Sequence, residues 1–184
     1  MTKPNIILTG FMGSGKTTVG KLLAKQLSYN FVDTDRLIEK RCGMTVQELF
    51  KTKGEEGFRS MEADIARELG TGQGMVISTG GKLMLNPTNV QALSASGRIF
   101  CLVASPEETL KRVSVDSGAK RPLLDMANPM DRIVELLQER QDGYSRFQQI
   151  VTTGKSPKEV ADNLLKIFRE NPDLSRPMLT KELQ

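Results

Sequence analysis

The segment GFMGSGKT, residues 10–17, places glycines, a lysine and a threonine at the spacing of a phosphate-binding loop, G-x-x-x-x-G-K-[ST]. Its glycines would let consecutive backbone N–H groups curve round phosphate oxygens. Lys16 would reach the β- and γ-phosphates of ATP or GTP, and the Thr17 hydroxyl would ligate Mg²⁺. The alternative, a glycine turn without a ligand, is disfavoured because the segment lies between a strand-like and a helix-like stretch. The residues predicted to bind the nucleotide here are Gly13, Ser14, Gly15, Lys16, Thr17 and Thr18.

Two carboxylates, Asp33 and Asp35, end the second apolar run of the chain, FVDTD. Residues i and i+2 of an extended chain share a face roughly 7 Å apart, so both side chains can point into the crevice where open α/β sheets bind ligands. One carboxylate could hold the water shell of a metal while the other handles an acceptor hydroxyl. The alternative is that one of the pair only caps the helix that begins near Arg36.

Histidine is absent from the 184 residues, so a general base must be a carboxylate, a lysine, a tyrosine or the substrate itself. The same absence excludes a histidine-based triad and zinc-finger spacing, and two cysteines cannot form a disulfide framework. A switch GTPase would usually carry N-K-x-D and D-x-x-G segments, and neither string occurs. These exclusions favour an enzyme that binds a nucleotide over a nucleotide-dependent switch.

The overall composition is that of a globular chain, with 38% apolar and 26% charged residues, and its length is typical of one domain. The net charge of +4 is modest and scattered, which suits small anionic ligands, and we expect no nucleic-acid partner. No apolar run approaches membrane-spanning length, and the N-terminal residues lack a secretory pattern. We therefore expect a cytoplasmic protein without a membrane partner.

Strand-like and helix-like segments alternate along the chain, which predicts an α/β fold with a parallel sheet and helices on both faces. Three helices should begin with a capping residue followed by proline, at Asn86, Ser105 and Ser156. Glu108 and Glu159 would complete capping boxes for the last two. The expected strands are 5–9, a strand that ends at 31–32, 76–78, 98–103 and 149–151.

The region 36–69 is mostly helical in pattern, with breaks near Gly43 and again at Lys53, Gly54 and Gly57. Residues 114–129 combine glycine, charged residues and two prolines between helical patterns, which suits a mobile loop. We expect a single domain over residues 1–170 and an irregular tail over 171–184.

Six sequence features occur together in the order and approximate spacing of shikimate kinases, which this chain resembles over about residues 5–168. The resemblance implies a three-layer P-loop kinase fold, similar to nucleoside monophosphate kinases, with a five-stranded parallel sheet flanked by helices. It also implies a lid at about 114–129 and a substrate-binding helical segment at about 33–62. The features are the loop 10–17, Asp33-Thr34-Asp35, GEEGFR at 54–59, STGG at 78–81, RPLL at 121–124, and Arg140-x-x-x-Tyr144.

The activity implied by the resemblance is transfer of the ATP γ-phosphoryl group to the 3-hydroxyl of shikimate, with Mg²⁺, in the pathway to chorismate. By the same resemblance, Asp33 assists Mg²⁺ through water, and Asp35 binds the acceptor hydroxyl and takes its proton. Two alternatives stay open: a kinase of another small hydroxy acid or nucleotide on the same scaffold, and a non-catalytic nucleotide-binding module. We expect a monomer.

Arginines carry the remaining implied roles. Arg59 and Arg140 resemble the pair that holds the shikimate carboxylate, a task that suits the guanidinium fork, and Gly80 and Gly81 would contact the same substrate. Arg121 resembles the lid arginine that closes over the transferred phosphate. Arg112 and Pro157 resemble the pair that flanks adenine, although Pro157 could equally be a helix-start proline and nothing more.

Lys82 departs from the family pattern, in which three consecutive glycines follow this strand where this chain has Gly80, Gly81 and Lys82. A positive φ at Lys82 would cost about 1 kcal/mol or more, and a negative φ would carry no such cost. The Lys82 stem could lie along the surface with its ammonium in water or near acidic groups of the cleft. Alternatively, Lys82 adds a cation to a site for an anionic substrate.

Overall fold

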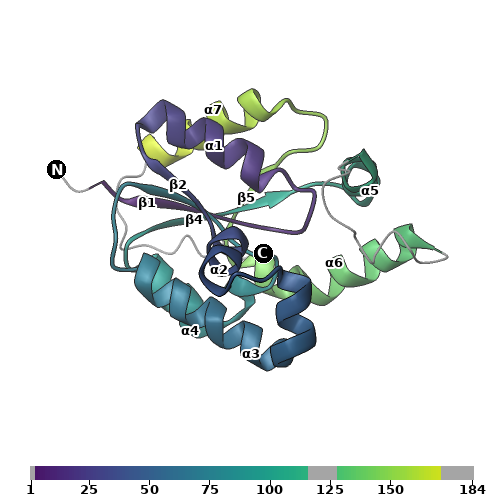
Figure 1. Cartoon of the computed structure of the whole chain (residues 1–184). Coiled ribbons are helices and arrows are strands. Elements are labelled where there is room, and N and C mark those ends of the chain that lie inside the picture. The colour runs from purple at the N-terminus through teal and green to yellow at the C-terminus, as the bar shows by residue number, and fades with distance from the viewer. Residues whose placement is uncertain (1–2, 116–127, 171–184) are drawn as a thin grey trace.

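A five-stranded, entirely parallel sheet forms the centre of the computed structural model, which describes residues 3–115 and 128–170 (Figure 1). The strand order β2-β3-β1-β4-β5 puts the first strand in the middle of the sheet. All five predicted strands are confirmed, with ends that shift by at most one residue. Their bounds are β1 Asn5–Thr9, β2 Asn30–Asp33, β3 Met75–Ser78, β4 Gly97–Val103 and β5 Gln148–Val151.

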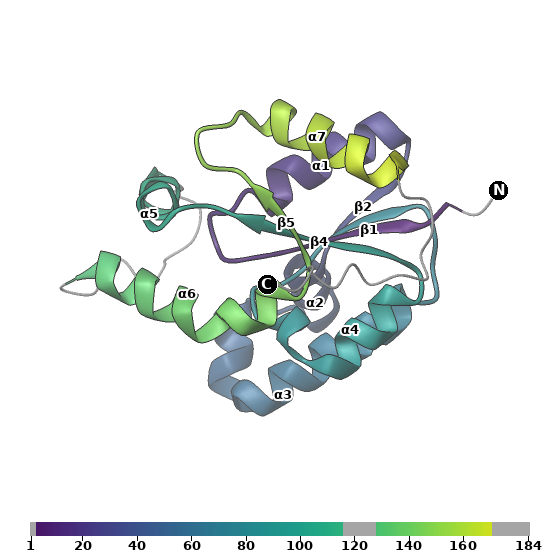
Figure 2. The same ribbon diagram turned by 180° about the vertical axis from the view of Figure 1, so that it is seen from behind.

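Helices cover both faces of the sheet and give three layers, as predicted (Figures 1 and 2). On one face, α1 (Lys16–Leu27) packs against α7 (Pro157–Glu170). The other face carries α3 (Val46–Leu69), α4 (Pro87–Ser94) and α6 (Pro129–Ser145). The remaining elements are α2 (Thr34–Cys42), the short 3₁₀ helix η1 (Leu83–Leu85) and α5 (Pro106–Val115).

The core consists of two apolar clusters, one on each side of the sheet. Every residue of β1 is buried, and successive side chains of a strand point to opposite faces. Ile6 and Leu8 therefore enter the cluster with Leu23 and Leu164, whereas Ile7 enters the cluster beneath α3 and α4. Burial on both faces explains why β1 reads as a continuous apolar run, and it fixes the position of the loop that follows.

All three helix-start predictions are confirmed, and of the two predicted capping boxes only the one at α7 forms. Ser156 and Glu159 make the reciprocal pair of a capping box, and the Asn86 side chain accepts a hydrogen bond from the Thr88 N–H. At α5 the Ser105 hydroxyl accepts from the Glu108 N–H at 3.2 Å, but no second half of the box forms with Glu108. The Ser105 N–H instead donates to the Thr153 hydroxyl, and the Glu108 carboxylate accepts from Arg112. The predicted Glu108 capping box is thus wrong, because a closer cation takes its carboxylate.

The helical region between β2 and β3 is broken where glycines allow it. Gly43 ends α2 with φ 64°, and Thr45 with Glu48 forms a capping box that starts α3. Within α3, Gly54 has φ 68° and ψ −180°, so the helix is kinked there, while Gly57 remains helical. A left-handed φ is available to glycine without strain, which makes Gly54 the residue that permits the kink.

Three earlier predictions lie partly or wholly outside the described residues. Of the predicted lid, 114–129, only its two ends are described, and Arg121 lies within the omitted part. The tail 171–184 is likewise outside. Among the described residues, no helix combines the length and the hydropathy needed to cross a membrane.

Candidate functional site

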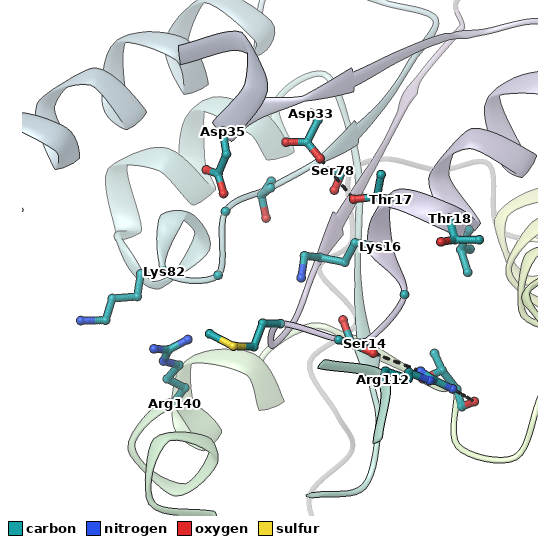
Figure 3. Close-up of a pocket in the computed structure, with 18 of the residues that line it drawn as sticks. Ser14, Lys16, Thr17, Thr18, Asp33, Asp35, Ser78, Lys82, Arg112 and Arg140 are labelled. Atoms are coloured by element: carbon teal, nitrogen blue, oxygen red, sulfur yellow. Dashed lines mark hydrogen bonds between the residues drawn. The ribbon is translucent and has the colours of Figure 1, made fainter. Parts of the chain in front are cut away.

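A cleft of about 860 Å³ opens at the carboxyl ends of the strands, where open parallel sheets bind their ligands (Figure 3). The loop after β1, the Asp33–Asp35 pair after β2 and the Ser78–Gly81 turn after β3 meet here because neighbouring strands are parallel. All but one of the predicted site residues line this cleft. They are Gly13, Ser14, Gly15, Lys16, Thr17, Thr18, Asp33, Asp35, Arg59, Gly80, Gly81, Arg112, Arg140 and Pro157; Arg121 lies outside the described residues.

The loop 10–15 is shaped for close approach of a ligand to the backbone. Gly10, Gly13 and Gly15 all have positive φ values, of 131°, 73° and 97°. A Cβ at Gly10 would collide with the main-chain carbonyl of Leu102. Position 10 therefore requires glycine both because of this close contact and because of its positive φ. Gly15, which has no side chain to cap α1, leaves the first-turn N–H groups free to face a phosphate.

Lys16 opens α1 with its side chain folded back over the loop. Its Nζ donates to the carbonyl oxygens of Gly10 and Phe11, each at 2.9 Å. Burial lowers the pKa of Lys16 from 10.5 to about 8, and the neighbouring Asp35 opposes that change. Lys16 is thus a cation at neutral pH, held by the backbone and surrounded by too little water to screen it.

Asp33 caps α2, one of the two alternatives that the sequence left open, and its other carboxylate oxygen contacts Thr17. Its Oδ1 accepts from the Arg36 N–H at 3.3 Å and caps α2, while its Oδ2 accepts from the Thr17 hydroxyl at 3.2 Å. A hydroxyl and a carboxylate side by side are the hard oxygens that suit Mg²⁺. In the described parts of the chain, no three acidic, histidine or cysteine side chains cluster to hold a metal by themselves. The pair therefore fits a magnesium ion that takes its other oxygens from water and phosphate.

Asp35 is the group in the cleft best suited to accept a proton. It lies in the first turn of α2, and its Oδ1 is buried without a hydrogen-bond partner within residues 3–115 and 128–170. Burial, together with the charges of Asp33 and Glu62, raises the pKa of Asp35 from 3.8 to about 6, although Lys16 opposes the rise. A carboxylate with a pKa near the working pH is a good general base. Figure 3 shows Asp35 and Lys16 pointing into the same space.

The Gly80–Gly81 turn owes its glycines to crowding by side chains from distant segments. A Cβ at Gly80 would lie 2.6 Å from Asp35 Oδ1 and 3.0 Å from Glu62 Oε1. A Cβ at Gly81 would lie 3.2 Å from an Arg140 nitrogen. The Gly80 N–H donates to the Thr34 hydroxyl at 2.9 Å, and the Gly81 carbonyl accepts from the Tyr144 hydroxyl. Both glycines thus allow functional side chains to approach the end of β3.

Arg59 projects into the cleft from α3, downstream of the kink at Gly54. Its Nη1 donates to Glu62 Oε2 at 2.6 Å, and its Nη2 donates to Glu55 Oε1 at 3.1 Å. The guanidinium also lies over the Phe58 ring, 5.5 Å from its centroid. The side chain of Glu62 is only 1% exposed, and this burial raises its pKa while Arg59 opposes the rise. The buried carboxylate of Glu62 therefore holds the Nη1 side of the Arg59 guanidinium in place.

Arg140 enters the cleft from α6, a different helix from the one that carries Arg59. Its guanidinium lies over the Phe11 ring at 5.0 Å, and its Nε is buried without a hydrogen-bond partner among the described residues. A buried N–H without an acceptor is costly by roughly 1–3 kcal/mol unless a ligand supplies one. The cleft therefore contains two guanidinium groups, from α3 and α6, that an anionic ligand could satisfy.

Lys82 follows the glycine turn with φ −108°, so its backbone is unstrained. Its Nζ lies 3.3 Å from Glu55 Oε1, and its side chain is half-exposed. The expectation that its ammonium lies near an acidic group of the cleft is confirmed. In Figure 3 the Lys82 side chain extends at the opposite end of the cleft from Arg112.

Arg112 joins three segments at the other end of the cleft. Its Nη1 donates to the Gly13 carbonyl at 3.2 Å and to the Thr152 hydroxyl at 2.9 Å, and its Nη2 donates to the Thr152 carbonyl at 3.0 Å. Glu108 accepts from its Nε at 2.9 Å. Pro157 starts α7 and also lines the cleft, so its helix-start role is confirmed and its contact with adenine stays a prediction.

Sequence reasoning missed several residues of the cleft. The spacing of Glu108 and Arg112 at i and i+4 could have revealed that pair. Ser78, which pairs in register with Asp33, could have been placed from the strand order. The same kind of spacing could have paired Glu55 and Glu62 with Arg59. Tyr144 was named only as part of a motif, and its contact with Gly81 has no local signal. Thr152 and Lys155 also line the cleft without a local signal, and Thr152 reaches Arg112 from 40 residues away in sequence.

The arrangement supports a transfer between two sites in one cleft. A loop of glycines with Lys16 can hold phosphates, and Asp35 can accept a proton beside it. The arginines beyond Asp35 can bind an anionic group on the second ligand.

Comparison with known proteins identifies relatives over nearly the whole described chain. A sequence model of the family described as "SKI: Shikimate kinase" matches residues 12–169. A shikimate kinase of Caldanaerobacter subterraneus is 45% identical over 166 residues, which cover 89% of this chain and 95% of that protein. A shikimate kinase of Thermodesulfovibrio yellowstonii is 43% identical over 165 residues, which cover 89% of this chain and 94% of that protein.

A solved structure is similar to the whole fold. Shikimate kinase from Acinetobacter baumannii, in complex with shikimate, aligns with a TM-score of 0.84 and 35% identity. The alignment covers 92% of this chain and 95% of the other.

Proposed function

This chain belongs to the shikimate kinase family, and on that premise we propose how its cleft carries out the reaction. The protein transfers the γ-phosphoryl group of ATP to the 3-hydroxyl of shikimate, which gives shikimate 3-phosphate and ADP in aromatic amino acid biosynthesis. One observation carries the assignment of roles: Lys16, the buried unpaired Asp35 oxygen and two arginines from different helices line a single cleft.

At the nucleotide end, backbone N–H groups of Gly13, Gly15 and the first turn of α1 hold the phosphates. Lys16 exchanges its two carbonyl contacts for β- and γ-phosphate oxygens, which its buried charge binds strongly. Thr17 and Asp33 would hold Mg²⁺, Asp33 through water. When bound, the ion supplies positive charge against the phosphate oxygens. Arg112 and Pro157 flank adenine, and Ser14 and Thr18 complete the nucleotide contacts.

At the acceptor end, Asp35 accepts a hydrogen bond from the attacking hydroxyl and takes its proton as the oxygen–phosphorus bond forms. Its pKa of about 6 leaves it ionised at neutral pH and yet close enough to accept the proton. Arg59 and Arg140 bind the shikimate carboxylate, and the backbone of Gly80 and Gly81 lies against the ring. Arg121 would close over the transferred phosphate and exclude water.

The function is tested with purified protein, Mg²⁺ and ATP in an assay coupled to ADP release. Shikimate should be phosphorylated, with shikimate 3-phosphate identified by mass spectrometry and NMR. A panel of other hydroxy acids and nucleoside monophosphates, assayed in parallel, separates shikimate kinase from other kinases on this scaffold. Absence of shikimate turnover by well-folded protein would contradict the proposal. If another compound of the panel were phosphorylated with a higher kcat/KM, that compound would be assigned as the acceptor in place of shikimate.

The monomeric state and the cytoplasmic location expected from the sequence remain predictions. Light scattering coupled to size-exclusion chromatography measures the first directly, and one mass near 20.4 kDa is the expected result.

A further inference from the structure

Glu55 is an acceptor shared by two cations that lie on different segments of the cleft. Its Oε1 accepts from Arg59 Nη2 at 3.1 Å and from Arg59 Nε at 3.3 Å. The same oxygen lies 3.3 Å from Nζ of Lys82, which is on the turn after β3. Glu55 therefore joins the helix that carries Arg59 to the turn where this chain departs from three consecutive glycines.

The donor groups of Arg59 are divided between two carboxylates of this same chain. Glu62 takes Nη1, and Glu55 takes Nε and Nη2. A substrate carboxylate binds a guanidinium best through two parallel N–H groups. Glu55 occupies one such pair, Nε and Nη2, so it must release Arg59 before an acceptor carboxylate can bind that pair.

Glu55 is the carboxylate that can leave. Glu62 has a side chain only 1% exposed, and breaking its pair would strand a buried charge. The side chain of Glu55 is 58% exposed and belongs to the first residue after the kink at Gly54. Glu55 can therefore turn away from Arg59 at little cost in solvation.

A released Glu55 would still lie close to the incoming anion. Hydrogen bonds from Arg59 and then Lys82 hold the pKa of Glu55 below its usual value, so the group stays ionised. Without another cation, its negative charge would compete for Arg59 and repel the acceptor carboxylate. Lys82 is already within reach of the same oxygen and has an unstrained backbone.

We propose that Lys82 is a positioning residue for acceptor binding, which retains Glu55 when Arg59 exchanges Glu55 for the carboxylate of the acceptor. Lys82 itself does not touch the acceptor. The inference rests on the proposed function, because it requires an anionic acceptor at Arg59. It gives a role to the residue that replaces the third glycine of the family pattern.

The test is a double-mutant cycle on Lys82 and Glu55, with KM for shikimate, KM for ATP and kcat measured separately at about 0.15 M salt. Lys82→Met should raise KM for shikimate roughly threefold, the range of an exposed ion pair, with kcat and KM for ATP unchanged. Glu55→Gln should leave KM for shikimate equal or lower, because a competitor for Arg59 is gone. Lys82→Met should then have no further effect in the Glu55→Gln protein.

Two controls isolate the position of the charge. Lys53→Met removes another exposed lysine two residues before Glu55 and should leave every constant unchanged. Lys82→Arg keeps the cation and should restore KM. Thermal unfolding of each variant, within about 1 °C of the parent, shows that an exposed substitution has not changed the fold.

Three outcomes would overturn the proposal, and they differ from one another. An equal rise in KM from Lys82→Met with and without Glu55 would mean that Lys82 contacts the acceptor directly. If the parent protein is active and Lys82→Met has the same KM for shikimate, the ion pair between Lys82 and Glu55 is only a surface contact without a role in acceptor binding. A parent without shikimate turnover would overturn both this inference and the proposed function.

Discussion

At the nucleotide end of the cleft, Lys16 donates to two main-chain carbonyls, and Arg112 donates to two more as well as to the Glu108 carboxylate and the Thr152 hydroxyl. At the acceptor end, by contrast, Arg59 and Lys82 donate to side-chain carboxylates. The carbonyls of Gly10 and Phe11 are fixed by the loop and by the buried strand before it. The carboxylate of Glu55 is exposed and can rotate. The nucleotide end is thus set by the backbone, and the acceptor end is set by ion pairs that a single substitution can change.

The two ends of the cleft also differ in which segments of the sequence contribute their residues. Most of the phosphate-binding end comes from one contiguous segment, 10–18, on a central strand and its helix. The acceptor end takes residues from α2, α3, the turn after β3 and α6. Residues on separate elements can be substituted independently of one another. Lys82 is such a substitution, whereas crowding by nearby side chains requires glycine at the adjacent positions 80 and 81.

Among the substitutions that distinguish the two ends of the cleft, Asp35→Asn should have the largest effect, and this effect should be on kcat. The amide cannot take the proton of the acceptor hydroxyl, so kcat should fall by about 10²–10⁴-fold. The affinity for ATP, measured by calorimetry, should change by less than about twofold, since the substitution leaves Lys16 and the phosphate-binding loop in place. A variant with near-normal kcat would show that Asp35 is not the base.

A second comparison concerns two glycines with positive φ, one at each end. Gly10→Ala places a methyl group against the Leu102 carbonyl and strains the backbone, so the free energy of unfolding should fall by about 3 kcal/mol or more. Gly54→Ala meets nothing within 4 Å and should cost only about 1–2 kcal/mol, from backbone strain at φ 68°.

Urea unfolding of both variants, or the yield of folded protein if Gly10→Ala does not accumulate, measures the contrast. Equal losses at the two positions would contradict the view that the nucleotide end is the more tightly packed.

Much of the fold could be predicted from the sequence because its signals are local. Buried strands such as 5–9, the loop 10–17 and the capping of α7 by Ser156 depend on residues close together in the chain. The Glu108 capping box failed because Arg112 and Thr153 compete for the same groups. The prediction considered only Ser105 and Glu108, and the competing contact from Thr153 lies 48 residues away in sequence.

Apart from Asp35, which the pattern after the second strand indicated, the acceptor site could be predicted only through the family resemblance. Nothing near Glu55 in sequence shows that Lys82 is its partner, and nothing near Gly81 indicates Tyr144. Those pairs exist because parallel strands and kinked α3 bring distant segments together. Arg121 was also placed by resemblance, and it lies outside the described residues.

The smallest of the expected effects is a gain in stability from the same Asp35→Asn change. The pKa of Asp35 is about 6 in the folded protein, against an ordinary 3.8. The protonated side chain therefore contributes fully to the free energy of unfolding below about pH 4, and this contribution is lost as the pH rises through 6. At pH 8 the neutral amide should unfold with about 1–2 kcal/mol more free energy than the carboxylate, after allowance for the lost attraction to Lys16.

Urea unfolding at pH 4 and pH 8 checks this sign. The difference between Asp35→Asn and the parent should vanish at the lower pH. A variant that is less stable at pH 8 would mean that the Asp35 charge is well compensated in the folded protein.

The central claim is that one cleft joins a backbone-fixed phosphate site to an arginine-lined site for an acid. The most direct test compares shikimate with its methyl ester as acceptors for the wild-type protein, with Mg²⁺ and ATP saturating. We expect shikimate to be phosphorylated on its 3-hydroxyl and the ester to lose about 10- to 100-fold in kcat/KM, because the neutral ester forfeits the charge-assisted bonds to Arg59 and Arg140. Equal turnover of acid and ester, or transfer to neither, would contradict this account.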